Sequence, residues 1–328
     1  MLFPDLHRVI HPSGALLQAA EKLNPDLPLS TGEILVDVEM LSIDSNSYRQ
    51  IREACNGNEN QMKEMILTIV AERGKMHNPV TGSGGMLIGT VSSTVDENRR
   101  GFTKGDKIAT LVSLTLTPLK IQHIVSLNPR NPIVRIEGHA ILLPSSIAVR
   151  LPDDIKETVA LAALDVCGAP KLMQLYCEKS KSILILGGGK SGILSAMAAV
   201  DTGCSDITIL EQSAGRVAVL NKLNQPFKVI CANAKDIQSL AGYFQQFDLT
   251  FDCMNIPNAE MAAVLCTKST GKIIYFNTAT SFTQAALGAE GVGSEVTMLI
   301  GNGFYPGHAE YIFELIRKYD FITGLLNE

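Results

Sequence analysis

Residues 180–216, "SKSILILGGGKSGILSAMAAVDTGCSDITILEQSAGR", narrow the choice of fold more than any other part of the sequence. An apolar run meets a cluster of glycines, a run with helical character follows, and a second apolar run ends at Glu211. The glycines match the spacing G-x-G-x-x-G, which is weak evidence alone but informative between a strand and a helix. The stretch therefore predicts a βαβ unit that binds a dinucleotide.

Each glycine of "GGGKSG" has a separate role in such a unit. Gly187 permits the tight turn out of the strand, Gly189 lets the backbone approach a pyrophosphate, and Gly192 allows close packing of helix on sheet. The amides at the start of the helix favour negative charge. The alternative is a glycine-rich turn without a ligand. The cofactor contacts predicted in this turn are Gly187, Gly188, Gly189, Lys190, Ser191 and Gly192.

Glu211 stands about 20 residues after the glycines, where a carboxylate can accept hydrogen bonds from the adenosine ribose hydroxyls. A carboxylate at this position repels a 2′-phosphate, so the sequence favours NAD over NADP. Ser213 and Arg216 follow closely and are able to accommodate a phosphate, so NADP stays open. We count Arg216 among the candidate cofactor contacts.

From residue 182 onward, apolar runs alternate with segments long enough for crossover helices. This alternation predicts a parallel sheet covered on both faces, which is an α/β fold. Two predicted strands end near Asn255 and Asn277, at the edge where cofactor contacts gather. Either side chain can bind the nicotinamide ribose or amide, or can simply shape a turn. The predicted strands are 182–186, 206–210, 227–231, 248–252 and 272–276.

The first half of the chain shows a different pattern of predicted secondary structure. Residues 33–42 alternate apolar and polar as a strand does, and the second half of 46–74 has helical spacing that ends at Gly74. Strands and turns dominate up to about residue 150, so we predict a β-rich, partly closed domain. A helix is predicted to open at Pro152 and Asp153. The predicted parts are a substrate domain over 1–150, a Rossmann NAD-binding domain over 151–300 and a C-terminal return segment over 301–328.

Composition excludes several classes of protein. The 328 residues suggest two domains, and 46% hydrophobic residues can fill their cores. A net charge of −5 without a Lys/Arg cluster argues against nucleic acid. No apolar run reaches the ~18 residues of a membrane span, and we expect no signal peptide. The scattered cysteines include no CxxC pair and indicate buried free thiols in a reducing cytoplasm.

The order of the parts resembles the medium-chain dehydrogenase/reductase superfamily, which includes the alcohol dehydrogenases. The resemblance lies in "GEILVDVEMLSIDSNSY" at 32–48 and "GFTKGDKIATLV" at 101–112. It implies a β-rich, GroES-like substrate domain beside the Rossmann domain. By analogy it also implies a homo-oligomer, which we expect to be a dimer.

The zinc positions of that superfamily are altered in this sequence. Asp44 stands where zinc-dependent relatives have a cysteine, and Ser83 stands where "G-H-E" carries a histidine. Only Cys167 is kept, and "LVSLTLTPLKIQHI" replaces the lobe with four cysteines. Since catalytic zinc needs three protein ligands, we expect no metal.

Longer strings are similar to one family within the superfamily, the L-erythro-3,5-diaminohexanoate dehydrogenases. They are "LHRVIHPSG" at 6–14, "SIDSNSYRQI" at 42–51 and "ERGKMHNPVTGSGGMLIGTV" at 72–91. The resemblance implies NAD-dependent oxidative deamination of that diamino acid to 5-amino-3-oxohexanoate, with release of ammonium, in anaerobic lysine degradation. The alternatives are a zinc-free reductase of the quinone or enoyl type and a non-catalytic dinucleotide sensor.

Oxidative deamination requires a base, because an ammonium group has no electron pair with which to expel hydride. Asp44 is the first candidate, since the resemblance places it where substrate heteroatoms bind. Ser83 is a candidate to hydrogen-bond the amine or water, and His77 is a candidate proton relay. The alternatives are a capping Asp, a turn Ser and a structural His.

Other charges are candidates for the two charged ends of the substrate. Glu59 and Asp165 are candidates for its 5-ammonium group, and Asp165 falls among apolar residues, where a carboxylate needs a partner. Lys75, Arg49 and Arg52 are candidates for its carboxylate, and the sequence does not choose among them.

Overall fold

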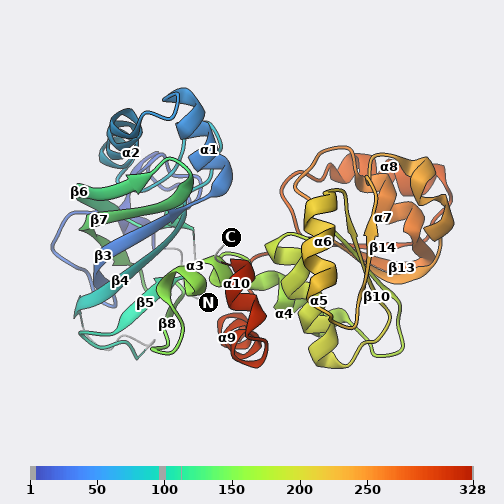
Figure 1. Ribbon diagram of the computed structural model, residues 1–328. Coiled ribbons are helices and arrows are strands. Elements are labelled where there is room, and N and C mark those ends of the chain that lie inside the picture. Colours follow the sequence, from blue (N-terminus) through green and yellow to red (C-terminus); the bar gives the residue numbers. More distant parts are fainter. Residues whose placement is uncertain (1–4, 96–100, 112, 327–328) are drawn as a thin grey trace. The chain divides into compact units, whose positions relative to one another are not determined.

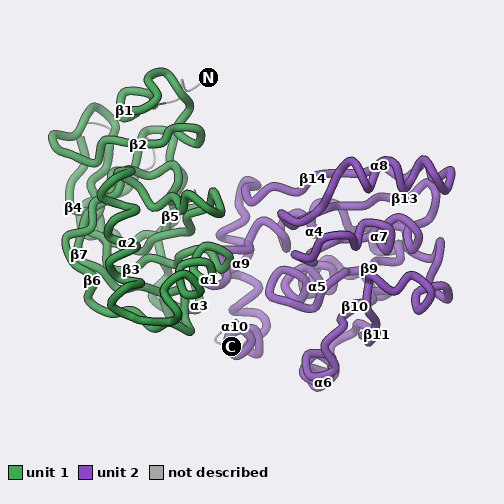
Figure 2. The backbone as a smooth tube through the Cα atoms, turned by 90° about the horizontal axis from the view of Figure 1, so that it is seen from above, with its two compact units in different colours: residues 1–161 green, residues 162–328 purple. Residues whose placement is uncertain are grey.

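The computed structural model describes residues 5–95, 101–111 and 113–326. The chain divides into two compact units, residues 1–161 and 162–328 (Figure 2). The second unit includes the segment after residue 300. The division into parts at residues 150 and 300 stays a prediction.

The first unit is built on an antiparallel sheet of the order β6-β7-β3-β4-β5-β8 (Figure 1). The alternating stretch at 33–42 forms the central strand β3, and its buried positions carry apolar side chains of the core. The strands are β1 (Val9–His11), β2 (Lys22–Leu23), β3 (Ile34–Ile43), β4 (Gly85–Thr94), β5 (Lys107–Thr110), β6 (Leu119–Asn128), β7 (Asn131–Leu142) and β8 (Ala148–Arg150).

Two α-helices connect β3 to β4, namely α1 (Ser45–Ala54) and α2 (Glu59–Arg73). The predicted helix is α2, and it ends at Gly74, which has a φ of 62°. A Cβ at this position would lie 2.0 Å from the carbonyl oxygen of Leu23, so only glycine fits. Short 3-10 turns are η1 (Leu6–Arg8) and η2 (Leu114–Leu116).

A buried ion pair fixes the start of the chain to the beginning of β3. The Glu33 side chain is fully buried and accepts hydrogen bonds from Arg8 Nε at 2.8 Å and Arg8 Nη2 at 2.6 Å. His7 Nε2, at 2.8 Å, and the Ser30 amide, at 2.6 Å, also contact this carboxylate. Arg8 donates in addition to the carbonyl oxygen of Pro28. Both buried charges are therefore compensated by hydrogen bonds, as burial requires.

The second unit is built on a parallel sheet of the order β11-β10-β9-β12-β13-β14. The strands predicted from residue 182 onward are confirmed. The structure also contains an edge strand, β14, that was not predicted. The strands are β9 (Ile183–Leu186), β10 (Ile207–Glu211), β11 (Lys228–Cys231), β12 (Phe247–Asp252), β13 (Thr267–Tyr275) and β14 (Thr297–Ile300).

Helices flank this sheet, and α4 packs on both α5 and α9 (Figure 1). The helix predicted to open at Pro152 begins instead at Glu157, because residues 152–155 form a turn closed by the Ile155 amide on the Pro152 carbonyl. Helix α3 (Glu157–Leu164) spans the sequence boundary between the two units. The helices of the second unit are α4 (Gly168–Tyr176), α5 (Lys190–Thr202), α6 (Ala214–Lys222), η3 (Ile237–Tyr243), α7 (Glu260–Cys266), α8 (Phe282–Gly291), α9 (His308–Lys318) and α10 (Phe321–Leu326).

Within residues 5–95, 101–111 and 113–326, none of the single helices combines the length and apolar character of a membrane span. The bent pair α3 and α4 matches such a span only when the two helices are taken together, by length and composition.

Candidate functional site

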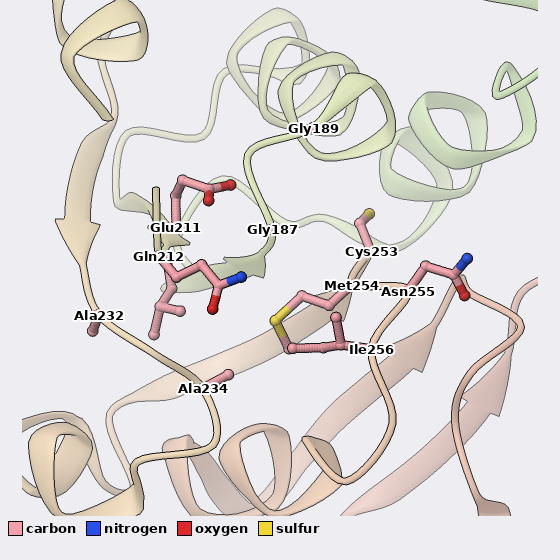
Figure 3. Close-up of a pocket in the computed structure, with 11 residues that line it drawn as sticks. Gly187, Gly189, Glu211, Gln212, Ala232, Ala234, Cys253, Met254, Asn255 and Ile256 are labelled. Atoms are coloured by element: carbon pink, nitrogen blue, oxygen red, sulfur yellow. The ribbon is translucent and has the colours of Figure 1, made fainter. Parts of the chain in front are cut away.

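A pocket lies at the carboxyl ends of the strands of the second unit (Figure 3). Glu211 and Gln212, at the end of β10, face it from one side, and residues after β12 face it from the other. It therefore lies at the point where the strand order reverses, between β9 and β12, where dinucleotides bind to sheets of this kind. Its lining is Gly187, Gly189, Leu210, Glu211, Gln212, Ala232, Ala234, Cys253, Met254, Asn255 and Ile256.

The glycine turn has the geometry that a dinucleotide phosphate requires. Gly187 adopts a φ of 95°, which side chains disfavour. A Cβ on Gly192 would lie 1.8 Å from the Gly187 carbonyl oxygen, whereas a Cβ on Gly189 would meet no atom within 4 Å. Gly189 is the N-cap of α5, and no side chain among the described residues caps the start of this helix. The turn fits the pyrophosphate of a dinucleotide.

Glu211 and Arg216 both form hydrogen bonds with the backbone of Gly188, one with its amide and the other with its carbonyl oxygen. Glu211 Oε2 accepts from the Gly188 amide at 2.9 Å, and Glu211 Oε1 accepts from the Ser213 amide at 2.8 Å. Arg216 Nε donates to the Gly188 carbonyl oxygen at 2.8 Å. Each Glu211 oxygen keeps a second lone pair for a ribose hydroxyl. The carboxylate thus shapes the turn as well as facing the pocket.

The two predicted asparagines lie on neighbouring loops at the same edge of the sheet. Asn255 is exposed, and its Oδ1 accepts from the Thr278 hydroxyl at 3.1 Å. Asn277 Oδ1 accepts from the amides of Ala279, at 3.0 Å, and Thr280, at 2.9 Å. Asn277 therefore performs the turn chemistry that was its alternative role, while Asn255 lines the pocket.

Asp252 belongs to this region but was missed in the sequence. It ends β12 with 3% of its surface exposed, and its Oδ1 accepts from the amide of the pocket residue Met254 at 2.9 Å. Burial raises the pKa of Asp252 to about 7. The signal was available, because "DLTFD" ends an apolar strand on an acid. Asp252 orients the loop that forms one wall of the pocket.

In the first unit, Asp44 and Ser83 are brought together by the pairing of β3 with β4. The Asp44 amide donates to the Gly84 carbonyl oxygen at 3.2 Å. Asp44 Oδ1 caps α1 by accepting from the amides of Asn46, at 2.9 Å, and Ser47, at 3.2 Å. No hydrogen bond among the described residues uses Oδ2. The structure thus shows the capping role of Asp44 and leaves one carboxylate oxygen for other work.

A cluster of hydroxyl groups lies beside this cap. The hydroxyl of the buried Ser47 lies 2.5 Å from that of Thr81 and 3.3 Å from that of Ser83. Asn78, also buried, accepts from the Thr81 amide and donates to Gln50 Oε1 at 2.9 Å. Ser47 and Asn78 fix the "NPVTGSGG" loop, and sequence reasoning had selected only Ser83 from it.

His77 precedes this loop and is half-buried. Its Nδ1 is buried without a hydrogen-bond partner in the part of the chain that the structure describes. Burial, with the nearby charges of Lys75 and Arg73, lowers the pKa of His77. The ring is therefore neutral near pH 7. No hydrogen bond within the described ranges links it to Asp44 or Ser83.

Lys75, a candidate for the substrate carboxylate, lies in the interior. It has 0% exposed surface, and its Nζ donates to the carbonyl oxygens of Leu17, at 3.1 Å, and Thr115, at 2.8 Å. Burial lowers the pKa of Lys75 to about 8. This placement corrects the assignment, since its ammonium connects three segments and is out of reach of a substrate.

The two carboxylates suggested for the 5-ammonium group lie in different units. Glu59 is exposed in the first turn of α2 and pairs with Lys63 at 2.6 Å. Asp165 is exposed between α3 and α4, although its neighbours in the sequence are apolar. Arg49, on α1, is exposed and donates to Asn46 Oδ1 at 3.1 Å. Nothing in the structure singles out one of these side chains for the substrate.

The positions that carry zinc in relatives offer a poor set of ligands. The Cys167 thiol is buried and donates to the Leu164 carbonyl oxygen at 3.1 Å, and burial raises the pKa of Cys167 to about 12. Among residues 5–95, 101–111 and 113–326, no group of three or more His, Cys, Asp or Glu side chains is arranged to hold a metal ion. Asp44 and Ser83 are engaged in the cap and the hydroxyl cluster.

Comparison with known proteins agrees with this geometry. Residues 7–152 match the family model of the L-erythro-3,5-diaminohexanoate dehydrogenase N-terminal domain. The chain is similar to cinnamyl alcohol dehydrogenase from Sorghum bicolor, with a TM-score of 0.57, 11% identity and coverage of 92% of this chain and 88% of the other. The predicted α/β fold with Rossmann and GroES-like parts is confirmed.

Two relatives resemble the chain over nearly its whole length. The chain is 43% identical to L-erythro-3,5-diaminohexanoate dehydrogenase of Fusobacterium nucleatum, over 98% of this chain and 96% of that one. It is 41% identical to the enzyme of the same name from Acetoanaerobium sticklandii, over 96% of this chain and 95% of that one. The predicted resemblance is confirmed. With two such relatives, the chain belongs to the family of L-erythro-3,5-diaminohexanoate dehydrogenases.

Proposed function

We propose that the protein oxidises L-erythro-3,5-diaminohexanoate with NAD and releases ammonium. The substrate ammonium at C3, NAD⁺ and water give 5-amino-3-oxohexanoate, ammonium, NADH and one proton. The main support for this proposal is the similarity of the chain to two enzymes that act on this compound by name, at more than 40% identity over nearly the full chain. The glycine turn and the pocket beside Glu211 supply a binding site for the dinucleotide.

The residues of the first unit would manage the protons of this reaction. When bound, the nicotinamide accepts the hydride from C3. The C3 ammonium must first lose a proton, and Asp44 Oδ2 is our candidate to take it, since Oδ1 is held by the cap. Hydride loss leaves an iminium at C3. Asp44 must first release its proton to solvent, and the regenerated carboxylate can then deprotonate the water that attacks the iminium. Ser83, fixed by Ser47, is our candidate to orient the amine or the water.

The preference for NAD is attributed to Glu211. Its carboxylate is anchored by two backbone amides, so it stays at the mouth of the pocket rather than swinging away from a 2′-phosphate. Arg216, the residue able to attract such a phosphate, uses Nε on the Gly188 carbonyl oxygen. Both contacts favour a cofactor with a free ribose 2′-hydroxyl.

We expect Glu211→Gln to lower the affinity for NADH by about tenfold, since removing a charged hydrogen-bond acceptor costs ~1.5 kcal/mol or more. The affinity for NADPH should fall less or rise, because the repulsive charge is gone. Fluorescence titration with NADH and NADPH measures both. Glu290→Gln removes an exposed charge of α8 and serves as the matched control. An unchanged NADH to NADPH ratio would remove Glu211 as the selective residue.

The proposed activity is tested by a direct assay of the purified protein. With NAD and 3,5-diaminohexanoate, absorbance at the NADH band and released ammonium should rise together in equal amounts. Lysine and simple alcohols should give neither signal. Oxidation of simple alcohols, or oxidation of NADPH by an enone, without turnover of the diamino acid would point to another reaction. Formation of neither NADH nor ammonium from the diamino acid would contradict the proposal.

A further inference from the structure

Lys171, on α4, carries a half-buried ammonium group without a counter-ion. Its Nζ donates to Gln174 Oε1 at 2.8 Å and lies 5.4 Å from the centre of the Tyr311 ring. No carboxylate in the described ranges forms an ion pair with it. Removing an ammonium from water costs free energy, which an anionic partner would offset. The group is therefore poised to receive an anion.

The amino-terminal turn of α9 meets this ammonium. A Cβ on Gly307, the N-cap of α9, would lie 4.0 Å from Lys171 Nζ. No side chain caps the helix, and no hydrogen bond among the described residues uses the amides of Ala309 or Glu310. A helix start with unused amides attracts negative charge. The Lys171 ammonium and the amino-terminal end of α9 would therefore both attract an anion.

His308 adds a buried polar atom without a partner to the same turn of α9. It is the first residue of α9 and has 2% of its surface exposed, yet its Nε2 has no partner in the described part of the chain. Burial lowers the pKa of His308, and the charge of Lys171 acts in the same direction, while Glu310 and the Tyr305 carbonyl oppose it. The imidazole is neutral, so Lys171 supplies the positive charge of the site.

The position of α9 in the second unit suggests which anion binds. Residues 301–307 leave the carboxyl end of β14, where the Gly301 amide continues the sheet by donating to the Tyr275 carbonyl oxygen at 2.8 Å. Glu211 lies across the switch point, on β10. A dinucleotide with its adenosine ribose at Glu211 extends its nicotinamide toward β12 and β13. Lys171 and α9 thus belong to the nicotinamide side of the sheet.

We propose that Lys171 and the first turn of α9 bind the carboxylate of the diamino acid substrate, an assignment that rests on the function proposed above. The substrate has one carboxylate, separated from the reacting C3 by a single methylene. Two donors of fixed geometry would hold C1 and so place C3. Glu310, in the same turn, is exposed and makes no ion pair with Lys171.

Lys171→Gln tests the assignment with two substrates. For 3,5-diaminohexanoate, KM should rise about 10- to 100-fold with kcat little changed, as expected when a charged contact remote from the reacting atom is lost. For 2,4-diaminopentane, which is the same diamine without the carboxylate, the variant and the wild type should have equal kcat/KM. Lys171→Arg should restore most of the affinity for 3,5-diaminohexanoate. Lys222→Gln, at the exposed end of α6, is the charge-matched control.

The other outcomes separate this assignment from the function on which it rests. If the wild type oxidises 3,5-diaminohexanoate and Lys171→Gln leaves KM unchanged, the assignment is wrong and the function stands. Equal losses on both substrates also overturn the assignment. A wild type that oxidises neither substrate overturns both. Unchanged NADH affinity and unfolding temperature of Lys171→Gln show that the second unit is intact.

Discussion

Asp44→Asn should lower kcat for 3,5-diaminohexanoate by about 10²- to 10⁴-fold, the usual contribution of a general base. Asparagine caps helices as well as aspartate does, so the amides of Asn46 and Ser47 keep their acceptor and α1 keeps its position. The substitution removes the charge and little else. Initial rates of NADH formation measure the loss.

Two further variants of Asp44 separate its role as the N-cap of α1 from its proposed role as the base. Asp44→Ser should retain the cap and lack the base, and so should resemble Asp44→Asn in rate. Asp44→Ala should lose both and unfold at a lower temperature, since loss of an N-cap costs about 0.5–2 kcal/mol. NADH affinity should be equal in all of them, because the proposed dinucleotide contacts lie in the second unit. Full turnover by Asp44→Asn would exclude this carboxylate as the base.

Glu33→Gln should lower the free energy of unfolding by about 3–5 kcal/mol, because it leaves the buried guanidinium of Arg8 without its anion. Urea unfolding followed by circular dichroism measures the change. Asp26→Asn breaks the exposed pair with Lys120 and should have a much smaller effect. A Glu33 variant as stable as the wild type would show that the pair is dispensable.

The effect of Glu33 should depend on pH in a defined direction. Burial alone raises the pKa of Glu33, but hydrogen bonds from Arg8, Ser30 and His7 outweigh it, so the pKa falls below its ordinary value of 4.5. A carboxylate with a lowered pKa stabilises the folded state above that ordinary value. The contribution is lost as the pH falls through the folded pKa. The difference between wild type and Glu33→Gln should therefore shrink below about pH 4.5.

The nucleotide-binding half was predictable because its signals are local. The glycine turn, the strand before it and Glu211 fall within one short stretch, and each has a fixed place in a βαβ unit. In the first unit, Gly74 likewise marks the end of α2. The edge strand β14 escaped prediction, because its apolar run is short and both of its ends are exposed.

The surroundings of the candidate catalytic groups were not predictable, because distant segments create them. Lys75 was a candidate for the substrate carboxylate, yet its ammonium donates to the carbonyl oxygens of Leu17 and Thr115. Ser47 was not among the candidates, yet it contacts Ser83 from the opposite end of the connection between β3 and β4. Helix α1 is short and mostly polar, and only Ser47, Tyr48 and Ile51 are buried in it. Asp44 itself was located from resemblance, and the structure adds its cap.

The double engagement of Glu211 bears on attempts to redesign the cofactor specificity of this enzyme. Exchanging an acidic residue for a small neutral one is an obvious route toward NADPH, yet here the exchange would also release the Gly188 and Ser213 amides. A redesigned loop would have to supply new acceptors for both amides before any gain in phosphate recognition became visible. Libraries that vary residues 211–216 together are therefore better suited to the task than single exchanges.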